Sequence, residues 1–585
     1  MWQSDAMVHL GLKHWKLFGY GNLAAILSFA LSLPTILVVQ PANAETINTL
    51  TAEREQLSNN SVRSADSNIL NITAPKTKPN DNSVAAASDD NIPESIVVKS
   101  FDIVGSTVFS QEELASAVAS YQNRSLTLSE LYQARSEITK LYTEEGYVNS
   151  GAYIPPQELD DGKVTIAVLE GELEAIEVRG TERLDPDYVR SRLETAADKP
   201  VNVESLLEAL QLLRLDPLIA SVSAELSAGV RQGTSLLDVK IEEADNFNVT
   251  TSFDNGRSPS VGTNRRAVGL NHRNLLGFGD EFSFGYANTE GSDSFDFAYS
   301  FPFNALDGTV GLAYGFNFNE VIEDPFNALD IESESRYYEL SLRQPIINRP
   351  NRELALGISF TRQESETLLL NTPFALSRGA DENGETRIST IRLFQEFIER
   401  DDKKVLAFRS SFNIGIDAFD ATSNADAPDS IFFAWRGQSQ WVRQLERDFV
   451  FLLRGDLQLA TTGLVPLEQF RLGGFNSVRG YRQDLILGDN GLFASAELRI
   501  PVLRLGRTNG VIQLAPFFDL GTAWSSDDMA IDDDFISAVG IGLVFRAGEN
   551  FNARLDWGIP LVDIDTDSNS LQEDGIYFSI DYNFF

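Results

Sequence analysis

The stretch from residue 405 to residue 417 runs Val405-Leu-Ala-Phe-Arg-Ser-Ser-Phe-Asn-Ile-Gly-Ile-Asp417. Successive side chains of a β-strand point to opposite faces of the sheet, so every second residue shares a face. One face here is apolar and carries Leu406, Phe408, Phe412, Ile414 and Ile416. The other face is polar and carries Arg409, Ser411, Asn413 and Asp417. An apolar outer face opposite a polar inner face, over about ten residues, is typical of a strand in a transmembrane β-barrel.

The same alternation recurs along residues 246–585. It is clear in 449–459, and in 282–286 and 295–301, whose aromatic residues match in pattern across a polar tip at 288–294. Strands of a soluble sandwich alternate as well. The apolar face of this chain is unusually aromatic, as the girdles at the two membrane interfaces require. At roughly 20 residues per strand and connection, the region predicts a transmembrane antiparallel β-barrel of about 16 strands.

The final strand of this region is expected to close the barrel. Residues 576–585 alternate again, and one face is entirely apolar, with Ile576, Phe578, Ile580, Tyr582 and Phe584. A strand edge that faces lipid leaves backbone groups without partners, so a membrane barrel has no free edge. This strand should therefore pair with the first strand of the region.

A different, soluble pattern fills residues 96–244, and it occurs twice, in 96–172 and in 173–244. Each copy has the order β-α-α-β-β. The second helix of the first copy begins with Thr127-Leu-Ser-Glu130, a capping box whose hydroxyl and carboxylate bond free N–H groups at the helix start. So short a repeat is typical of a binding array rather than of a catalytic domain. The predicted elements are strands Ile96–Val104, Ser150–Pro155 and Lys163–Leu169 with helices from Gln111 and Thr127, then strands Leu173–Val178, Ala220–Leu226 and Ser235–Glu242 with helices Asp185–Leu193 and Val203–Leu215.

The N-terminus has the features of an export signal. A weakly basic start precedes an apolar run, Leu23–Val39, which Pro34 interrupts, and Ala42-Asn-Ala44 forms a small-x-small cleavage site. A single anchor helix is the alternative, which the short run and the cleavage site disfavour. We therefore predict a signal peptide in 1–44. Residues 45–95 are polar and almost free of aromatics, which predicts a low-complexity linker, with Thr46–Leu57 as a short helix that could plug a pore.

Composition excludes several classes of protein. The chain has no Cys, so disulfides and Cys nucleophiles are excluded. Its net charge of −38 disfavours nucleic-acid binding, which needs a basic face. Of the 3 His, only His272 lies beyond the predicted signal, so no metal cluster or catalytic triad can be built on a second His. No phosphate-binding loop is present. We expect no enzymatic activity, no catalytic residue, no cofactor and no metal site.

Several local motifs, in the order in which they occur, indicate a resemblance to a known family. The most specific are Val478-Arg-Gly-Tyr481 and Phe517-Phe-Asp-Leu-Gly521, each weak alone but strong together and in this order. The chain resembles the two-partner secretion transporters (TpsB proteins of the ShlB/FhaC/HecB type, the hemolysin and filamentous-hemagglutinin exporters), and its repeats resemble POTRA domains. The other sequences that support the resemblance are Gly146-Tyr-Val-Asn-Ser-Gly-Ala-Tyr-Ile-Pro-Pro-Gln157, Leu215–Leu226 with Gly229 and Gly233, Asp254–Gly262 and Asn274–Asp280.

The resemblance implies a specific contact inside the barrel. In the family the loop with the VRGY motif enters the barrel, and its Arg meets the Asp of the F-x-D-x-G strand motif. Here that pair is Arg479 and Asp519, which can form a bidentate, charge-assisted ion pair. It is either a latch that sets the channel during export or an ordinary ion pair that helps the barrel fold, and both stay open. The motif residues expected to accompany the pair are Val478, Gly480 and Tyr481 in the loop, and Phe517 and Gly521 on the strand.

Three further groups of polar residues are expected to have structural or solvated positions rather than a functional role. Arg554 and Asp556 are expected to be polar neighbours on a strand that faces the barrel interior. The acidic runs Asp527-Asp528 and Asp532-Asp533-Asp534 are expected to be solvated loops, because loop acidity is common and their spacing does not define a calcium site.

The resemblance implies a function and a location. The chain should lie in the outer membrane, as a single barrel in contact with lipid, with its POTRA domains in the periplasm. Its partner should be a secreted TpsA-like exoprotein of the hemolysin or adhesin type, which the POTRA domains bind unfolded and the barrel exports. The residues of the POTRA domains that bind it are unknown. Edges of the small sheets can accept an extended segment as an added strand.

Two alternatives remain from the sequence. A barrel-assembly insertase of the same superfamily would insert other β-barrels into the membrane, although such proteins typically carry more POTRA repeats. A passive porin would conduct small solutes, but it would need neither binding repeats nor the paired Arg and Asp motifs.

Overall fold

A computed structural model describes residues 70–72, 95–158, 161–324, 326–425, 428–506, 509–526, 534–548, 550–564 and 570–584. The predicted signal peptide (1–44) and the plug helix (Thr46–Leu57) lie outside the described residues. Among the described helices, none is long and apolar enough to cross a membrane.

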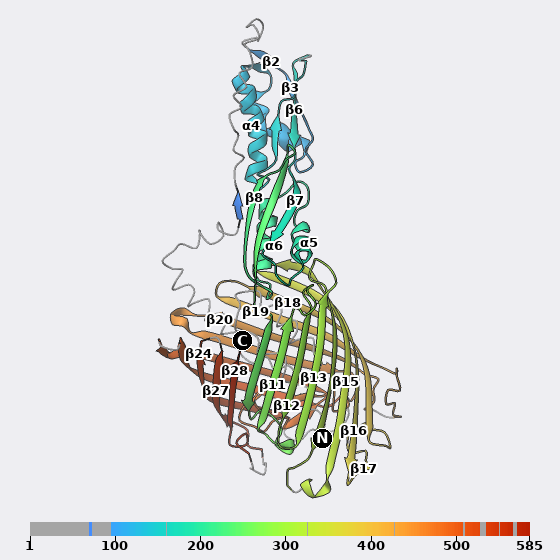
Figure 1. The fold of residues 1–585 in the computed structure, drawn as a ribbon. Coiled ribbons are helices and arrows are strands. Elements are labelled where there is room, and N and C mark those ends of the chain that lie inside the picture. The colour runs from blue at the N-terminus through green and yellow to red at the C-terminus, as the bar shows by residue number, and fades with distance from the viewer. Residues whose placement is uncertain are drawn as a thin grey trace. The chain divides into compact units, whose positions relative to one another are not determined.

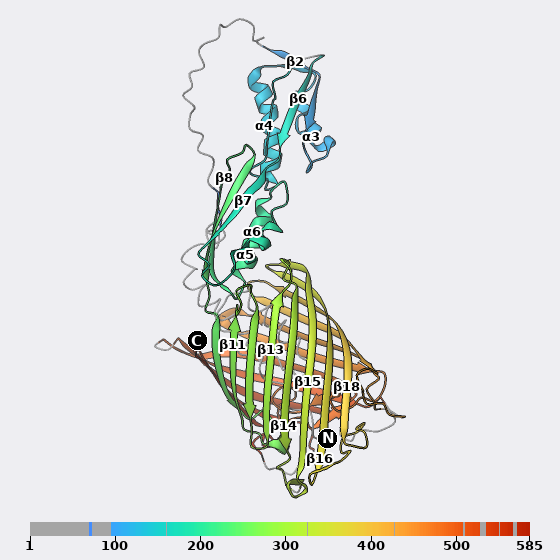
Figure 2. The ribbon, with the colours of Figure 1, turned by 45° about the vertical axis from the view of Figure 1, so that its right-hand side comes forward.

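The C-terminal region is a closed antiparallel β-barrel (Figures 1 and 2). In the described part of the chain, 16 strands follow one another around the barrel, which confirms the predicted strand number. They are β10 (Phe247–Asp254), β11 (Arg265–Arg273), β12 (Glu281–Asn288), β13 (Ser292–Pro302), β14 (Thr309–Glu320), β15 (Ile331–Arg349), β16 (Arg352–Leu369), β18 (Glu385–Arg400), β19 (Lys404–Ile416), β20 (Phe433–Gln444), β21 (Val450–Ala460), β24 (Asn490–Leu505), β25 (Gly510–Trp524), β26 (Phe535–Ala547), β27 (Phe551–Pro560) and β28 (Ile576–Asn583), with a small extra pairing at β17 (Thr372–Pro373).

The barrel closes where β28 pairs with β10, as the alternation in 576–585 predicts. Figure 1 shows β28, in red, beside the green strands that begin the barrel. This seam is short. Its register runs only from Thr250 opposite Asn583 to Asp254 opposite Ser579, whereas β15 and β16 pair along almost their whole length.

The polar face of each strand points into the barrel and the apolar face points outward. On β19, Arg409 and Asn413 are buried, while Phe408 and Phe412 are 40% and 37% exposed. On the outer face of the β12–β13 hairpin, Phe284 lies opposite Phe297 and their ring centroids are 5.0 Å apart. The aromatic match predicted across this hairpin is confirmed, although its turn is tighter than expected and spans only 289–291. An exposed aromatic surface of this kind suits contact with lipid.

The first repeat (96–172) forms β2 (Ile96–Val98), β3 (Ser100–Val104), α3 (Gln111–Ala117), η3 (Ala119–Tyr121), β4 (Arg124–Leu126), α4 (Leu128–Glu144), β5 (Gly151–Tyr153) and β6 (Lys163–Leu169). The capping box predicted at Thr127 and Glu130 is present. The single strand predicted over Ile96–Val104 is wrong, since it divides at Lys99. β2 pairs with β4, while β3 pairs with β6 and leaves sheet order β3-β6-β5.

The second repeat (173–244) forms β7 (Glu172–Arg179), α5 (Pro186–Glu194), α6 (Val203–Arg214), β8 (Ile219–Ala228) and β9 (Thr234–Glu243). All five elements predicted for it are present, and their ends differ by at most two residues. One strand was not expected. β1 (Leu70–Ile72), within the predicted linker, pairs in parallel with Ala224–Leu226 of β8 and gives the sheet order β1-β8-β9-β7.

Glu170 organises the interior of the first repeat. Its buried carboxylate accepts hydrogen bonds from the backbone N–H of Thr107 at 2.6 Å, the hydroxyl of Thr107 at 2.6 Å and the hydroxyl of Tyr142 at 2.8 Å. Burial raises the pKa of Glu170, but these hydrogen bonds outweigh it and hold the pKa below its usual value. The charged form is therefore the one that the fold stabilises.

We predict that Glu170→Gln lowers the free energy of unfolding of the first repeat by about 2–3 kcal/mol, because hydrogen bonds to a charged group are lost. A lowered pKa contributes stability that is present above the unfolded value near 4.3 and is lost as pH falls through the folded value. Limited proteolysis in urea at pH 7 and pH 4 measures both effects. Equal protease resistance of both proteins at pH 7 would contradict the prediction. Glu113→Gln, at an exposed helix cap, is the control.

Candidate functional site

The connection between β21 and β24 folds back into the barrel. This loop (461–489) contains a short hairpin of β22 (Phe470–Leu472) and β23 (Ile486–Gly488), and the VRGY motif lies at its turn. Gly480 adopts a φ of 106°, which L side chains rarely adopt, and a Cβ there would lie 3.2 Å from the backbone nitrogen of Pro560. The glycine therefore lets the loop approach β27 closely.

Arg479 and Asp519 form the ion pair that the resemblance implies. Nε of Arg479 lies 2.7 Å from one carboxylate oxygen of Asp519, and Nη2 lies 2.9 Å from the other. The backbone N–H of Arg479 donates to the same carboxylate at 3.2 Å, and the hydroxyl of Ser495 donates to it at 2.6 Å. Arg479 is 2% exposed and Asp519 is 0% exposed. The geometry is bidentate and fully desolvated, so it fixes both the position and the orientation of the loop.

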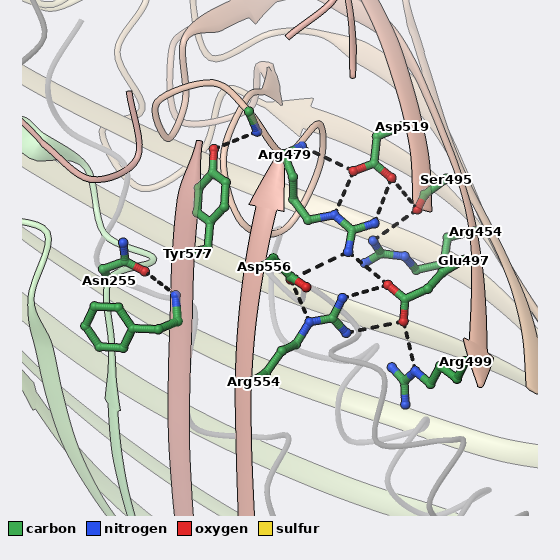
Figure 3. Close-up of polar contacts among 12 residues, drawn as sticks. Asn255, Arg454, Arg479, Ser495, Glu497, Arg499, Asp519, Arg554, Asp556 and Tyr577 are labelled. Atoms are coloured by element: carbon green, nitrogen blue, oxygen red, sulfur yellow. Dashed lines mark hydrogen bonds and ion pairs between the residues drawn. The ribbon is translucent and has the colours of Figure 1, made fainter. Parts of the chain in front are cut away.

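Two further carboxylates surround the same guanidinium (Figure 3). Nη1 of Arg479 lies 2.9 Å from Glu497 and 3.6 Å from Asp556. Glu497 also accepts two bonds from Arg554, at 2.6 and 3.3 Å, and one from Arg499 at 2.8 Å. The charged groups form one continuous network across β21, β24, β25 and β27. We call this network the wall cluster, and it consists of Arg454, Ser495, Glu497, Arg499, Asp519, Arg554 and Asp556.

The other motif residues pack around the ion pair. The ring of Phe517 lies under Arg479, with the guanidinium carbon 3.4 Å from the ring centroid. The hydroxyl of Tyr481 lies 2.9 and 3.0 Å from the backbone carbonyls of Ser537 and Val562, between which its single proton is shared. Val478 is buried, and a Cβ at Gly521 would come within 3.2 Å of it. The structure thus brings all seven predicted site residues together.

The interpretation of Arg554 and Asp556 as polar neighbours inside the barrel was incomplete. They face inward on β27, with Nε of Arg554 2.6 Å from Asp556, and both also belong to the wall cluster. Glu497 was missed by sequence reasoning. Its alternation with Ser495 and Arg499 on β24 marks an inward polar face, but a local pattern does not show which side chain crosses to a distant loop.

No metal site is found in the described part of the chain, where no group of three or more His, Cys, Asp or Glu side chains is placed to hold an ion. Most of the acidic runs considered above, Asp527-Asp528 and Asp532-Asp533, lie outside the described residues. His272 lies on β11, where its ring is 6.2 Å from that of Phe247.

Comparison with known proteins identifies the family. Residues 233–545, more than half of the chain, match the model of the haemolysin secretion/activation protein family ShlB/FhaC/HecB. Residues 96–171 match the POTRA domain of ShlB type, which corresponds to the first repeat. These matches confirm the resemblance drawn from the motifs.

Individual relatives agree with the family match. The heme/hemopexin transporter protein HuxB of Haemophilus influenzae (strain 86-028NP) is 24% identical over 476 residues, which cover 77% of this chain and 80% of the relative. The solved structure of CdiB from Escherichia coli has a TM-score of 0.66 at 20% identity and covers 94% of this chain and 100% of its own. BamA from Haemophilus ducreyi, solved without POTRA domains 1–3, has a TM-score of 0.52 at 12% identity and covers 84% of this chain and 100% of its own.

At these identities the two solved structures establish the fold alone, whereas the family model distinguishes secretion from other uses of the fold. The POTRA domains of this family lie in the periplasm, and its barrels lie in the outer membrane. The chain therefore belongs to the ShlB/FhaC/HecB family of haemolysin secretion/activation proteins and is an outer-membrane transporter of the two-partner secretion type, which exports a secreted exoprotein.

Proposed function

We propose that the chain captures an unfolded exoprotein of hemolysin or adhesin type in the periplasm through its two repeats and passes it through the barrel, whose path the loop 461–489 closes at rest. The observation that carries the proposal is the loop itself. It is docked inside the barrel by Arg479, whose guanidinium contacts three wall carboxylates. A passive porin would need neither two binding repeats nor the paired Arg and Asp motifs.

The repeats supply the proposed binding step. In the sheet of the first repeat, β3 and β5 are edge strands, and an edge strand offers unpaired backbone groups to an extended segment. Backbone pairing of this kind is tolerant of sequence, which suits an unfolded chain. We assign 96–172 and 173–244 to two POTRA domains, 246–585 to the barrel, 1–44 to a signal peptide and 45–95 to a linker.

The membrane setting follows from the outer surface of the barrel. Its exposed side chains are apolar and aromatic, as in Phe408, Phe412, Ile580 and Tyr582, so we propose a monomeric barrel in direct contact with outer-membrane lipid. The inward face is polar and contains buried ion pairs, such as those of Arg409 with Glu396 and Arg343 with Glu353. The proposal assigns no cofactor, no metal and no catalytic residue to this chain.

The barrel-assembly insertase is the second candidate, because BamA shares the fold and a fold by itself does not assign a function. The two functions differ in their cargo. An exporter moves one soluble partner to the outside, whereas an insertase leaves other barrels unassembled when it is missing.

We predict that expression of the chain in a Gram-negative host without its own two-partner system moves a co-expressed candidate exoprotein from the periplasm to the medium. The measurement is the fraction of exoprotein outside the cell, compared with a host that carries an empty vector. Correct assembly of the host's other barrels in both strains is the control. If the exoprotein stays in the periplasm although the transporter inserts normally, this chain does not export that exoprotein. If removal of this protein from its own cells leaves other barrels unassembled, the result supports the insertase.

A further inference from the structure

Asn255, which follows β10, extends the contact between β10 and β28 beyond their last registered pair. Beyond Asp254, the backbone N–H of Asn255 donates to the carbonyl of Phe578 at 3.3 Å. Its side-chain amide donates to the carbonyl of Ile576 at 2.9 Å and accepts from the N–H of Phe578 at 2.8 Å. Asn255 is 0% exposed. The end of the seam at Asp254 is thus held by a buried side-chain amide rather than by further backbone pairing.

Tyr577 lies between those two residues of β28 and points into the barrel, toward the loop (Figure 3). Its hydroxyl accepts a hydrogen bond from the backbone N–H of Gly480 at 2.9 Å and donates to the carbonyl of Tyr481 at 2.5 Å. Tyr577 is 0% exposed. Both hydrogen-bonding functions of the hydroxyl are therefore used on the backbone of the docked loop.

Gln572 makes a second neutral bridge between the same parts. Its side-chain oxygen accepts from the N–H of Gln483 in the loop at 2.8 Å. Its amide nitrogen donates to the carbonyl of Arg257 at 2.7 Å and to that of Asn255. The residue is 0% exposed. Loop, seam and the connection after β10 therefore share a set of buried hydrogen bonds that is separate from the ion pairs of the wall cluster.

We propose that Tyr577 is a positioning residue that couples docking of the loop to closure of the β10–β28 seam. A buried polar group resists losing its partners, because nothing replaces them. When the loop leaves, the Tyr577 hydroxyl loses both of its hydrogen bonds to the loop and keeps only the carbonyl of Gln572 at 3.5 Å, and β28 is released at the Asp254 end of the shortest pairing among the 16 barrel strands. The loop that closes the export path thus also stabilises the pairing of β10 with β28.

The inference uses the departure of the loop that the proposed function requires, but its test needs no exoprotein. Backbone hydrogen–deuterium exchange of the full-length protein in detergent reads the loop in peptides from 470–488 and the seam in peptides from 576–583. Tyr577→Phe removes only the hydroxyl. Tyr337→Phe is the matched control, since Tyr337 is also buried inside the barrel and its hydroxyl donates to Asp296 at 3.0 Å.

Tyr577→Phe is expected to accelerate exchange in both segments by about fivefold to tenfold, while Tyr337→Phe leaves both unchanged. Arg479→Ala, which frees the loop by a different route, should accelerate the seam as well as the loop. In the Tyr577→Phe background, Arg479→Ala should accelerate the loop only. If Arg479→Ala accelerates exchange in the seam only when the Tyr577 hydroxyl is present, the hydroxyl couples the loop to the seam. A merely structural role of Tyr577 would leave the effect of Arg479→Ala on the seam unchanged.

Unchanged exchange in 576–583 on Arg479→Ala would overturn the proposal, as would an equal effect of Arg479→Ala with and without the hydroxyl. If Tyr577→Phe fails to give a heat-modifiable barrel, Gln572→Met tests the same coupling through the second bridge, with the same two outcomes. Secretion measured in parallel keeps the two proposals apart, since coupling can hold in a protein that does not export the tested partner.

Discussion

Arg479→Ala is expected to reduce secretion of the exoprotein to roughly a hundredth of the wild-type level while the barrel still inserts into the outer membrane. Removal of one partner from a buried ion pair costs about 3–5 kcal/mol, which shifts an equilibrium by more than about 100-fold. Arg479 contacts three carboxylates, so the loop loses its ion pairs with the wall cluster. Because export is proposed to need a loop that alternates between a docked and a displaced position, a loop without a defined docked position is expected to impair it.

The measurement pairs secretion with heat-modifiable gel mobility, which reports insertion. Arg409→Ala is the matched control, because Arg409 is also a buried arginine inside the barrel and pairs with Glu396 at 3.0 Å, but it does not contact the loop in any described bond. Arg479→Lys should give an intermediate result, since lysine keeps the charge and loses the bidentate geometry. Wild-type secretion by an inserted Arg479→Ala barrel would show that the ion pair serves only the fold.

Deletion of residues 96–244 is expected to abolish secretion, again with the barrel inserted. The barrel strands close on one another without help from the repeats, as the pairing of β10 with β28 shows, so insertion should survive the deletion. Capture of the exoprotein should not, because the sheet edges proposed to bind it are removed.

Finer deletions locate the binding step. Removal of 96–172 alone leaves the second repeat in place and should already reduce secretion strongly if the edges of β3 and β5 bind the exoprotein. Periplasmic accumulation of intact exoprotein, detected by fractionation, is the expected accompanying result. Normal secretion by the larger deletion would contradict the role of the repeats and leave the barrel as the sole recognition element.

Local sequence predicted much of this architecture, because the relevant signals are short in range. Alternation alone placed Phe408 outward and Arg409 inward on β19, and the capping box placed the start of α4 at Thr127. The division of the predicted first strand at Lys99 was not predictable in this way. The backbone N–H of Lys99 donates to the carbonyl of Gly162 at 2.7 Å, a partner distant in sequence.

The site residues likewise divide into those that lie in a local motif and those that only the closed barrel brings together. Arg479 and Asp519 were expected from the family resemblance, because each lies in a recognisable motif. Glu497 and Tyr577 carry no motif and look like ordinary members of alternating strands. Their roles come from closure of the barrel, which brings β24 and β28 against one loop, and no pattern within a strand records that closure.

The wall cluster contains as many positive as negative side chains when the loop is left out of the count. Arg454, Arg499 and Arg554 stand against Glu497, Asp519 and Asp556. Docking of the loop therefore adds one positive charge to a surface whose own charges balance, and undocking restores that balance but leaves Asp519 with the Ser495 hydroxyl in place of its ion pair. We therefore expect the net charge of the vacated wall to favour neither acidic nor basic segments of a passing polypeptide, with Asp519 as the one group left ready to pair again with Arg479.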